Sequence, residues 1–238
     1  EFECNESWGY NTAYDMALDK RYGTEAKLKE FIDLCHQNGI AVILDVALNH
    51  VFSRSPLERM WMLDPDNDGW GNGITAENPY GNQSAMHSYN VGTDLNHFNA
   101  NNMTQYYSER TIQHWMQEFK IDGFRWDLTK GFTQNCPGGS NQETCTNAYQ
   151  ADRVLKLKQY ADMQWAIDPN FYVIFEHLGN GGSYTEEVEW ANYRKTGDAD
   201  GISKGILLWR KMTDAYANFL KGNSTNLSGV ADGANMFI

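Results

Sequence analysis

Residues 24–50 read TEAKLKEFIDLCHQNGIAVILDVALNH and decide the class of fold. Apolar residues recur at helical spacing through the first half, and Gly39 is a residue type that commonly ends a helix. A nearly continuous apolar run, residues 40–48, follows at once and is interrupted by Asp45. Such runs are typical of strands that are covered on both faces in a parallel sheet. The stretch therefore predicts a helix over 24–38 and then a buried strand.

The same alternation of helix and strand continues along the chain. Alternating elements of this length favour βα units and a parallel sheet, so the predicted class is α/β. A (β/α)8 TIM barrel takes about 250 residues, and two long polar insertions at 51–100 and 128–147 leave room for five or six of the eight strands. The further predicted elements are helices over 102–119, 148–166, 185–194 and 207–220 and strands over 121–126 and 171–175.

The composition is that of a folded, acidic protein. Hydrophobic residues make up 41% and charged residues 21% of 238 residues, which is typical of a globular chain. The net charge of −12 argues against a nucleic-acid partner, because phosphates require basic patches. No apolar run approaches the roughly 18 residues of a membrane span, so we expect no integral membrane segment. The aromatic content of 13% is consistent with a well-filled core, and it also suits a protein that binds sugars.

The sequence leaves open whether Cys136 and Cys145 form a disulfide. Cys136 and Cys145 bracket a polar loop that a local disulfide would staple, and a disulfide would favour an extracellular or periplasmic location. Cys35 lies on the apolar stripe of the first predicted helix and is expected to be a core thiol. The chain starts at Glu1 rather than Met and ends on the apolar residues 236–238, so we expect a piece of a longer protein.

Three successive predicted strands each terminate in a carboxylate, at Asp45, Asp127 and Glu176. Residues at the carboxyl ends of barrel strands face the active site. Two such acids could flank a glycosidic bond, or three could ligate a divalent cation in a lyase or isomerase. Arg125 lies two residues before Asp127, where it favours the ionised form of that acid and is a poor neighbour for a metal cluster. Glu176 has no cation adjacent in sequence, which favours its protonated form.

Five short motifs run in order along the chain and resemble conserved segments of the α-amylase family. Three of them contain the acids: DVALNH at 45–50, GFRWDLTK at 123–130 and FEH at 175–177. The resemblance implies that Asp127 is the nucleophile and Glu176 the general acid/base. It implies substrate-binding or supporting positions for Tyr10, Asp45, His50, Arg125, Lys130 and His177. The other two motifs are GY at 9–10 with YGT at 22–24, and TDLN at 93–96.

The resemblance also implies an architecture, and this chain differs from the family's pattern in two places. The expected fold is an incomplete barrel, roughly strands 3 to 6 with flanking pieces of strands 2 and 7, and a small B-domain-like insertion at 51–100. Residues 234–238 look like the start of the seventh strand, whose histidine–aspartate motif does not occur here. Gly131 stands where the family usually has a histidine. No cofactor is required, and the family's calcium ligands would map to Asn49 and Asp94.

The implied activity is retaining hydrolysis of α-1,4-glucosidic bonds in starch, glycogen or maltodextrins. Branching-type transglycosidases share the same motifs, and a fragment or homologue that is inactive or only binds carbohydrate is a further alternative. The retaining mechanism predicts that the carboxyl groups of Asp127 and Glu176 lie about 5–5.5 Å apart. The sequence does not indicate the chain length of the substrate or the oligomeric state of the protein.

Overall fold

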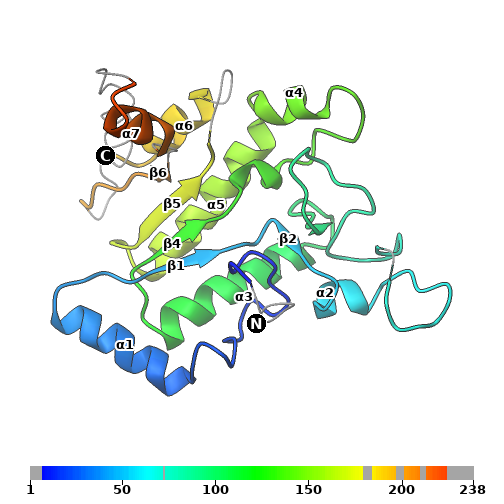
Figure 1. The fold of residues 1–238 in the computed structure, drawn as a ribbon, viewed down its shortest axis with the longest axis horizontal. Helices are drawn as coiled ribbons and strands as arrows, with labels where there is room; N and C mark the ends of the chain where they lie inside the picture. The colour runs from blue at the N-terminus through cyan, green and yellow to red at the C-terminus, as the bar shows by residue number, and fades with distance from the viewer. Residues whose placement is uncertain (1–6, 72, 179–183, 197–200, 210–212, 224–238) are drawn as a thin grey trace.

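A four-stranded parallel sheet forms the centre of the protein. The computed structural model describes residues 7–71, 73–178, 184–196, 201–209 and 213–223 (Figure 1). Within them the strand order is β1-β4-β5-β6. This arrangement confirms the predicted α/β class with a parallel sheet. The strands are β1 (Ile43–Val46), β4 (Gly123–Trp126), β5 (Tyr172–Glu176) and β6 (Leu207–Trp209).

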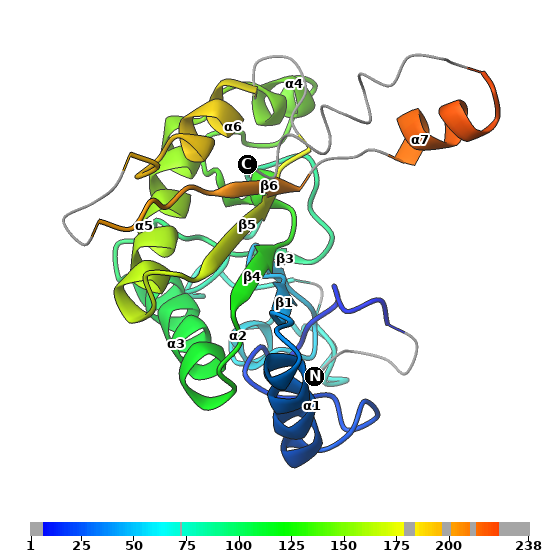
Figure 2. The same ribbon diagram turned by 90° about the vertical axis from the view of Figure 1, so that its left-hand side faces the viewer.

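Each parallel connection passes through a helix, because parallel strands require a long crossover. Helix α3 (Met103–Glu118) precedes β4, α5 (Ala151–Ile167) precedes β5, and α6 (Tyr184–Ala191) precedes β6. Figure 2 shows these three helices on one side of the sheet. Trp126 of the sheet stacks on Tyr160 of α5, with ring centroids 5.3 Å apart, inside one large apolar core. None of the described helices has the length and apolarity that crossing a membrane would take.

Helix α1 (Glu25–Gln37) confirms the first prediction in its limits but not in its burial. Thr24 caps it by accepting a hydrogen bond from Lys27 N–H, and Gly39 follows with a φ of +70°. Its apolar stripe is only partly covered, since Phe31 is 55% exposed and Cys35 is a partly exposed free thiol. The prediction of a core thiol at Cys35 is therefore wrong.

Strand β1 is shorter and more exposed than its apolar run suggested. It spans four residues and pairs only with β4 among the described strands, and Ile43 is 37% exposed. The expected cover on both faces is absent because α1 lies beyond this edge of the sheet, away from the side that α3 and α5 occupy (Figure 1).

The two insertions contain short elements that support the ends of the strands. In the first, β2 (His50–Val51) pairs antiparallel with β3 (Thr93–Asp94), and α2 (Pro56–Arg59) packs nearby. Val51, Leu57 and Leu95 form a small hydrophobic core that is separate from the large one. The second insertion holds the turn η1 (Thr129–Phe132) and helix α4 (Gln142–Asn147). A disulfide joins Cys136 to Cys145, so the stapled-loop reading is confirmed.

The predicted helix over 207–220 is wrong in its first part. Leu207–Trp209 is strand β6, and helix α7 covers Thr213–Leu220. The run Gly-Ile-Leu-Leu-Trp at 205–209 is a short apolar segment, and periodicity alone does not separate a strand from a helix at this length. Residues 234–238, expected to begin another strand, lie outside the described residues.

Candidate active site

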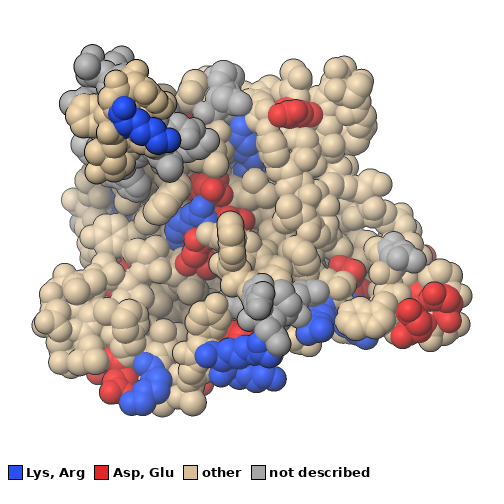
Figure 3. All heavy atoms as spheres, in the orientation of Figure 1, with Lys and Arg blue, Asp and Glu red and all other residues tan. Residues whose placement is uncertain are grey.

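The register of the sheet brings the predicted acids close together, with Asp45 two residues below the level of Asp127 and Glu176. Asp45 of β1 is aligned with Arg125 of β4, and Glu176 of β5 with Trp209 of β6. Asp127 follows β4 directly and its N–H donates to the carbonyl of Val46, at 2.9 Å. The three carboxylates therefore meet at the carboxyl edge of the sheet. Figure 3 shows acidic and basic side chains gathered in the middle of this face, over the central strands.

Arg125 is the centre of the cluster. Its Nη1 lies 2.8 Å from Asp45 Oδ1 and 2.9 Å from Asp127 Oδ1. Its Nη2 lies 2.9 Å from Glu176 Oε1. Tyr10 completes the group, since its hydroxyl donates to Asp45 Oδ2 at 2.9 Å. One planar guanidinium thus fixes three carboxylates, a task for which the arginine fork is suited. Because a cation already occupies their centre, the three acids do not form a metal-binding cluster.

The charge distribution differs from the one expected from sequence. Burial raises the pKa of the Asp127 carboxyl to about 7, the Glu176 charge acts in the same direction, and Arg125 opposes both. Arg125 thus lowers the pKa of Asp127 as expected, but burial and the Glu176 charge together outweigh it. Glu176 also has a cation beside it in space, contrary to its sequence surroundings. Three carboxylates and one guanidinium leave two negative charges uncompensated if all are ionised, so this cluster tends to retain a proton.

The carboxylate of Glu176 is held from two sides. Besides Arg125 at Oε1, it accepts a hydrogen bond at Oε2 from the N–H of Leu128, at 2.9 Å. Leu128 has φ 47° and ψ 56°, in the left-handed region. Residues other than glycine rarely adopt this backbone conformation, which costs of order 1–2 kcal/mol. The strained turn after β4 is what directs this N–H toward the neighbouring strand.

His177 lies behind the cluster. Its ring is 2% exposed, with Nδ1 3.0 Å from Thr129 Oγ1 and Nε2 2.7 Å from Glu186 Oε2. Burial lowers the pKa of His177 to about 4, so the ring is neutral near pH 7. Glu186 in turn pairs with the fully buried Arg153, at 2.8 Å. This conformation presents no ring nitrogen of His177 to a ligand, unlike the substrate-binding position that was expected.

His50 and Asn49 connect the first insertion to the cluster. The Nε2 of His50 lies 2.7 Å from the carbonyl oxygen of Tyr10, and burial lowers the pKa of this imidazole. The side-chain amide of Asn49 donates to the carbonyl of Asp127, at 2.8 Å. Both residues thus hold backbone that carries a member of the cluster.

Lys130 is buried, and no hydrogen bond among the described residues joins it to the three carboxylates. Its ammonium donates to Asn147 Oδ1 and lies 5.8 Å from the ring centroid of Tyr89. Burial lowers the pKa of Lys130, and the Arg153 charge acts in the same direction. The ammonium thus points toward helix α4 and the second insertion.

Trp209 is a member of the site that the sequence analysis did not find. Its ring centroid lies 5.4 Å from Arg125 Cζ, and the side chain is 47% exposed at the end of β6. It was missed because residues 207–209 were assigned to a helix. The available signal was an aromatic residue at the end of a short apolar run, the position that the acids occupy on the three preceding strands.

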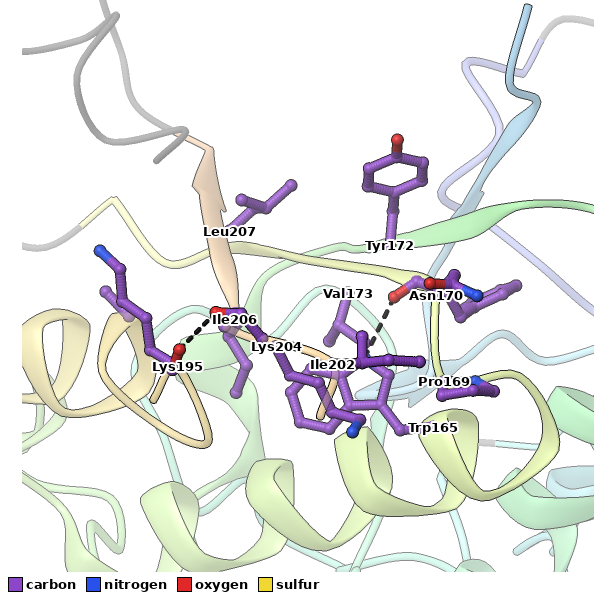
Figure 4. A pocket seen from close by; sticks show the side chains of 14 residues that line it. Trp165, Pro169, Asn170, Tyr172, Val173, Lys195, Ile202, Lys204, Ile206 and Leu207 are labelled. Atoms are coloured by element: carbon purple, nitrogen blue, oxygen red, sulfur yellow. Dashed lines mark hydrogen bonds between the residues drawn. The ribbon is translucent and has the colours of Figure 1, made fainter. Parts of the chain in front are cut away.

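Two of the cavities lie beside the sheet. One of about 320 Å³ adjoins Tyr10 and Asp45 and is lined by further aromatic side chains, among them Trp8, Tyr14 and Tyr22. The other, of about 240 Å³, lies where β5 and β6 begin, beside Trp165, Val173 and Ile206 (Figure 4). Only the first is next to the carboxylates, at the end where parallel α/β sheets bind ligands.

The residues expected to hold calcium do not fit that ion. Calcium takes six to eight oxygen ligands. Oδ2 of Asp94 already accepts hydrogen bonds from Met86 N–H and the Asn82 amide, and Oδ1 faces His87 Nε2 at 3.3 Å. Asn49 uses its amide nitrogen on Asp127 and has its oxygen against His50.

A second group of carboxylates lies on the first insertion, between Asn49 and Asp94 in the sequence. Asp64, Asp66 and Asp68 bring ligand atoms within 4.8 Å of one another on a largely exposed loop. Exposed acidic groups of this kind are common without an ion. This acidic loop therefore receives no assignment.

The chain is similar to known proteins over part of their length. A family model for the catalytic domain of alpha amylase matches residues 2–62. A malto-oligosyltrehalose trehalohydrolase of Saccharolobus solfataricus is 23% identical over 100% of this chain and 41% of its own length. A 1,4-alpha-glucan branching enzyme of Geobacillus stearothermophilus is 29% identical over 74% of this chain and 25% of its own length. The chain thus spans less than half the length of these relatives.

Solved structures support the same relationship at the level of the fold. A cyclomaltodextrin glucanotransferase matches with a TM-score of 0.60 and 19% identity, over 94% of this chain and 43% of that one. An α-amylase from Geobacillus thermoleovorans, complexed with acarbose, matches with a TM-score of 0.53 and 19% identity over 80% of this chain and 36% of that one. The family model over residues 2–62 and the similarity to these relatives agree with the resemblance to the α-amylase family that the five motifs suggested.

Proposed function

We propose that this chain carries the catalytic carboxylates of a retaining enzyme that acts on α-1,4-glucans. The observation that carries the proposal is the shared guanidinium of Arg125, which holds Asp127 and Glu176 on neighbouring strand ends at 2.9 Å each. Retaining glycosidases need two carboxylates close together on either side of the scissile bond. The neutral, hydroxyl-rich nature of a glucan also suits the aromatic cavity beside Tyr10 and Asp45.

The sheet is proposed to be an arc of a (β/α)8 barrel. The motifs would make β1 the third strand, β4 the fourth, β5 the fifth and β6 the sixth. The parallel order β1-β4-β5-β6 supports this assignment, as do the helices α3, α5 and α6 on one side of it. The first insertion would correspond to a small B-domain-like excursion between the third strand and α3.

In the proposed reaction, a carboxylate oxygen of Asp127 attacks the anomeric carbon while Glu176 gives its proton to the glycosidic oxygen. The carbon–oxygen bond breaks, the shortened glucan leaves as an alcohol, and a glycosyl ester remains on Asp127. Glu176, now ionised, takes a proton from water or from a sugar hydroxyl. That oxygen attacks the anomeric carbon and frees Asp127. Water gives hydrolysis, and a sugar hydroxyl gives transglycosylation.

The surrounding residues would orient the sugar and the acids. Tyr10 and the exposed face of Trp209 supply aromatic surface on which a pyranose ring can pack. Asp45 and Arg125 hold the carboxylates in place, and His50 holds the Tyr10 segment. For His177 we propose a supporting position behind Glu176, because its ring is buried against Thr129 and Glu186. Lys130 would act at the side of the leaving group, next to α4.

The proton of the cluster must lie on Glu176 when the glycosidic bond breaks. In the resting protein Asp127 competes for that proton, because burial raises the pKa of its carboxyl to about 7. Two carboxylates that interact this closely titrate as a pair. We therefore propose that activity falls as the pH drops through about 7, because the nucleophile Asp127 must be ionised.

Covalent trapping tests the proposal directly. A 5-fluoro-α-glucosyl fluoride carries a leaving group that needs no acid, so the ester accumulates on the nucleophile. Intact-mass and peptide analysis should find one glycosyl adduct, on the peptide that contains Asp127. Asp127→Asn should remain unlabelled, whereas Asp168→Asn, which changes a carboxylate before the opposite end of β5, should label like the parent. Absence of an adduct in the parent, or an adduct in Asp127→Asn, would contradict the retaining assignment.

Product analysis then distinguishes hydrolysis from transfer. Incubation with maltodextrin should release reducing ends in the parent and not in Glu176→Gln. If the reducing-end count stays constant while longer or branched products form, the transferase alternative is correct.

A further inference from the structure

A buried carboxylate on β3 faces a histidine where the family resemblance would place a cation. Asp94 and His87 are each 1% exposed, and Asp94 Oδ1 lies 3.3 Å from His87 Nε2. Among the described residues, neither of these two atoms has a hydrogen-bond partner of good geometry. A buried carboxylate oxygen is costly unless a positive charge or an N–H compensates it. The only compensating group at Oδ1 within the described contacts is the ring of His87.

The other ring nitrogen shows which tautomer faces Asp94. His87 Nδ1 accepts a hydrogen bond from the N–H of Tyr89, at 3.2 Å. A nitrogen that accepts carries a lone pair, so in the neutral ring the hydrogen is on Nε2. The ring nitrogen nearest to Asp94 Oδ1, at 3.3 Å, therefore carries a hydrogen, although the contact falls outside hydrogen-bond geometry. A metal-binding imidazole needs its lone pair at the ligating nitrogen, and Nε2 has none to offer here.

The space for this ring comes from a glycine. A Cβ built at Gly131 would lie 3.2 Å from His87 Nε2 and 2.9 Å from Asn49 Cβ, closer than side chains normally pack. Position 131 is also where this chain departs from the usual histidine of the family. The ring of His87, which comes from the first insertion, is thus wedged between Gly131, Asn49 and Asp94.

We propose that His87 replaces a divalent cation at this point, so that its Nε2–H holds the first insertion against the strand ends without metal. The connection continues to the carboxylate cluster, because Asn49 donates to the carbonyl of Asp127. Gly131 is the residue that makes this replacement possible. The active-site edge is consequently independent of calcium, whichever glucan reaction the carboxylates perform.

Thermal unfolding with and without divalent cations tests the proposal. The measurement is made in Asp64→Asn/Asp68→Asn protein, so that the acidic loop contributes no cation binding. Neither EDTA nor added calcium chloride or zinc chloride should move the unfolding temperature beyond experimental error. A rise with either cation that disappears when Asp94→Asn is added would overturn the proposal, because it would place an ion at Asp94.

Two substitutions of His87 separate its N–H from its bulk. His87→Gln keeps an N–H at nearly the distance of Nε2, whereas His87→Met has similar length and no donor. Leaving Asp94 Oδ1 uncompensated in His87→Met should lower the unfolding temperature by roughly 3–10 °C, and His87→Gln should recover at least half of that loss. Equal unfolding temperatures for the two variants would contradict the role of the N–H.

The tautomer can be read in the unmodified protein. Nitrogen-15 chemical shifts of the histidine rings should assign His87 a protonated Nε2 and an unprotonated Nδ1 in metal-free buffer. An unprotonated Nε2 would overturn the proposal even if neither variant folds.

Discussion

Arg125 Nη2 lies 2.9 Å from Oε1 of Glu176, while Nη1 of the same guanidinium contacts Asp127. The two acids of the proposed reaction therefore share one cation. A change in the charge of either carboxylate is felt by the other through this group as well as through space. The sequence suggested an arginine that serves Asp127 alone, and the sheet register makes it common to both.

Replacement of Arg125 by lysine should abolish this sharing while keeping the positive charge. An ammonium is a single point and does not span two carboxylates as the fork does. We expect kcat/KM for maltodextrin to fall by about 10²–10³-fold, the range seen when one fixed donor at a reacting centre is lost. The measurement is initial-rate kinetics on protein whose folding has been checked by circular dichroism.

Arg110→Lys is the matched control, because Arg110 lies on α3 and, among the described residues, donates its side-chain hydrogen bond to Gln113. It should leave the rate unchanged. Parent-like kinetics for Arg125→Lys would show that the fork is dispensable.

Asp15 should make the protein less stable as the pH rises toward neutrality. Burial raises the pKa of Asp15 to about 6 from an ordinary value of 3.8, against the hydrogen bond that Tyr107 donates to it. The folded protein therefore binds this proton more tightly than the unfolded chain does. The resulting stabilisation is complete below about pH 4 and is lost as the pH rises through about 6, by up to about 3 kcal/mol.

Asp15→Asn removes this loss, since an amide does not ionise and its oxygen still accepts from Tyr107. At pH 7 the variant should unfold at a higher denaturant concentration than the parent, and below pH 4 the two should converge. Asp33→Asn, on the exposed side of α1, should follow the parent at every pH. A constant difference between parent and Asp15→Asn across pH 4–7 would refute the raised pKa.

Trp209→Ala should weaken the binding of glucans without unfolding the sheet. The ring is 47% exposed beside Arg125, so its removal leaves little cavity and takes away an aromatic face. We expect the dissociation constant for maltoheptaose to rise by about 3–10-fold, measured by isothermal titration calorimetry with Asp127→Asn present to prevent turnover. Trp70→Ala, in the first insertion, serves as the control, and an equal effect of both substitutions would argue against a sugar contact at Trp209.

Much of the scaffold could be predicted from local signals. Thr24 and Gly39 delimit α1 as capping rules require, and the three acids mark the ends of β1, β4 and β5 as expected for parallel strands. Predictions failed where the partner of a residue is far away in sequence. The exposure of Cys35 depends on what packs against α1, and β6 was too short to show a period.

The electrostatics of the site depended most on distant partners. Glu176 has no cation within its own segment, and Arg125 reaches it only because β4 and β5 pair in one register. His87 carries no sequence signal of its own, since its environment is made by Gly131 and Asp94 from two other segments. These relationships arise from packing and are visible only once the sheet and the first insertion are assembled.

The left-handed backbone at Leu128 also restricts how this site can change over generations or in a mutant library. The group that anchors Glu176 there is main chain, so no exchange of side-chain chemistry at 128 can improve or imitate it. A replacement residue must adopt the left-handed backbone conformation and keep its N–H. Proline cannot, because it has neither the N–H nor access to a positive φ. Glycine, asparagine and aspartate adopt this conformation most readily. Active clones selected from a library randomised at this codon should therefore be enriched in those three residues, regardless of their polarity.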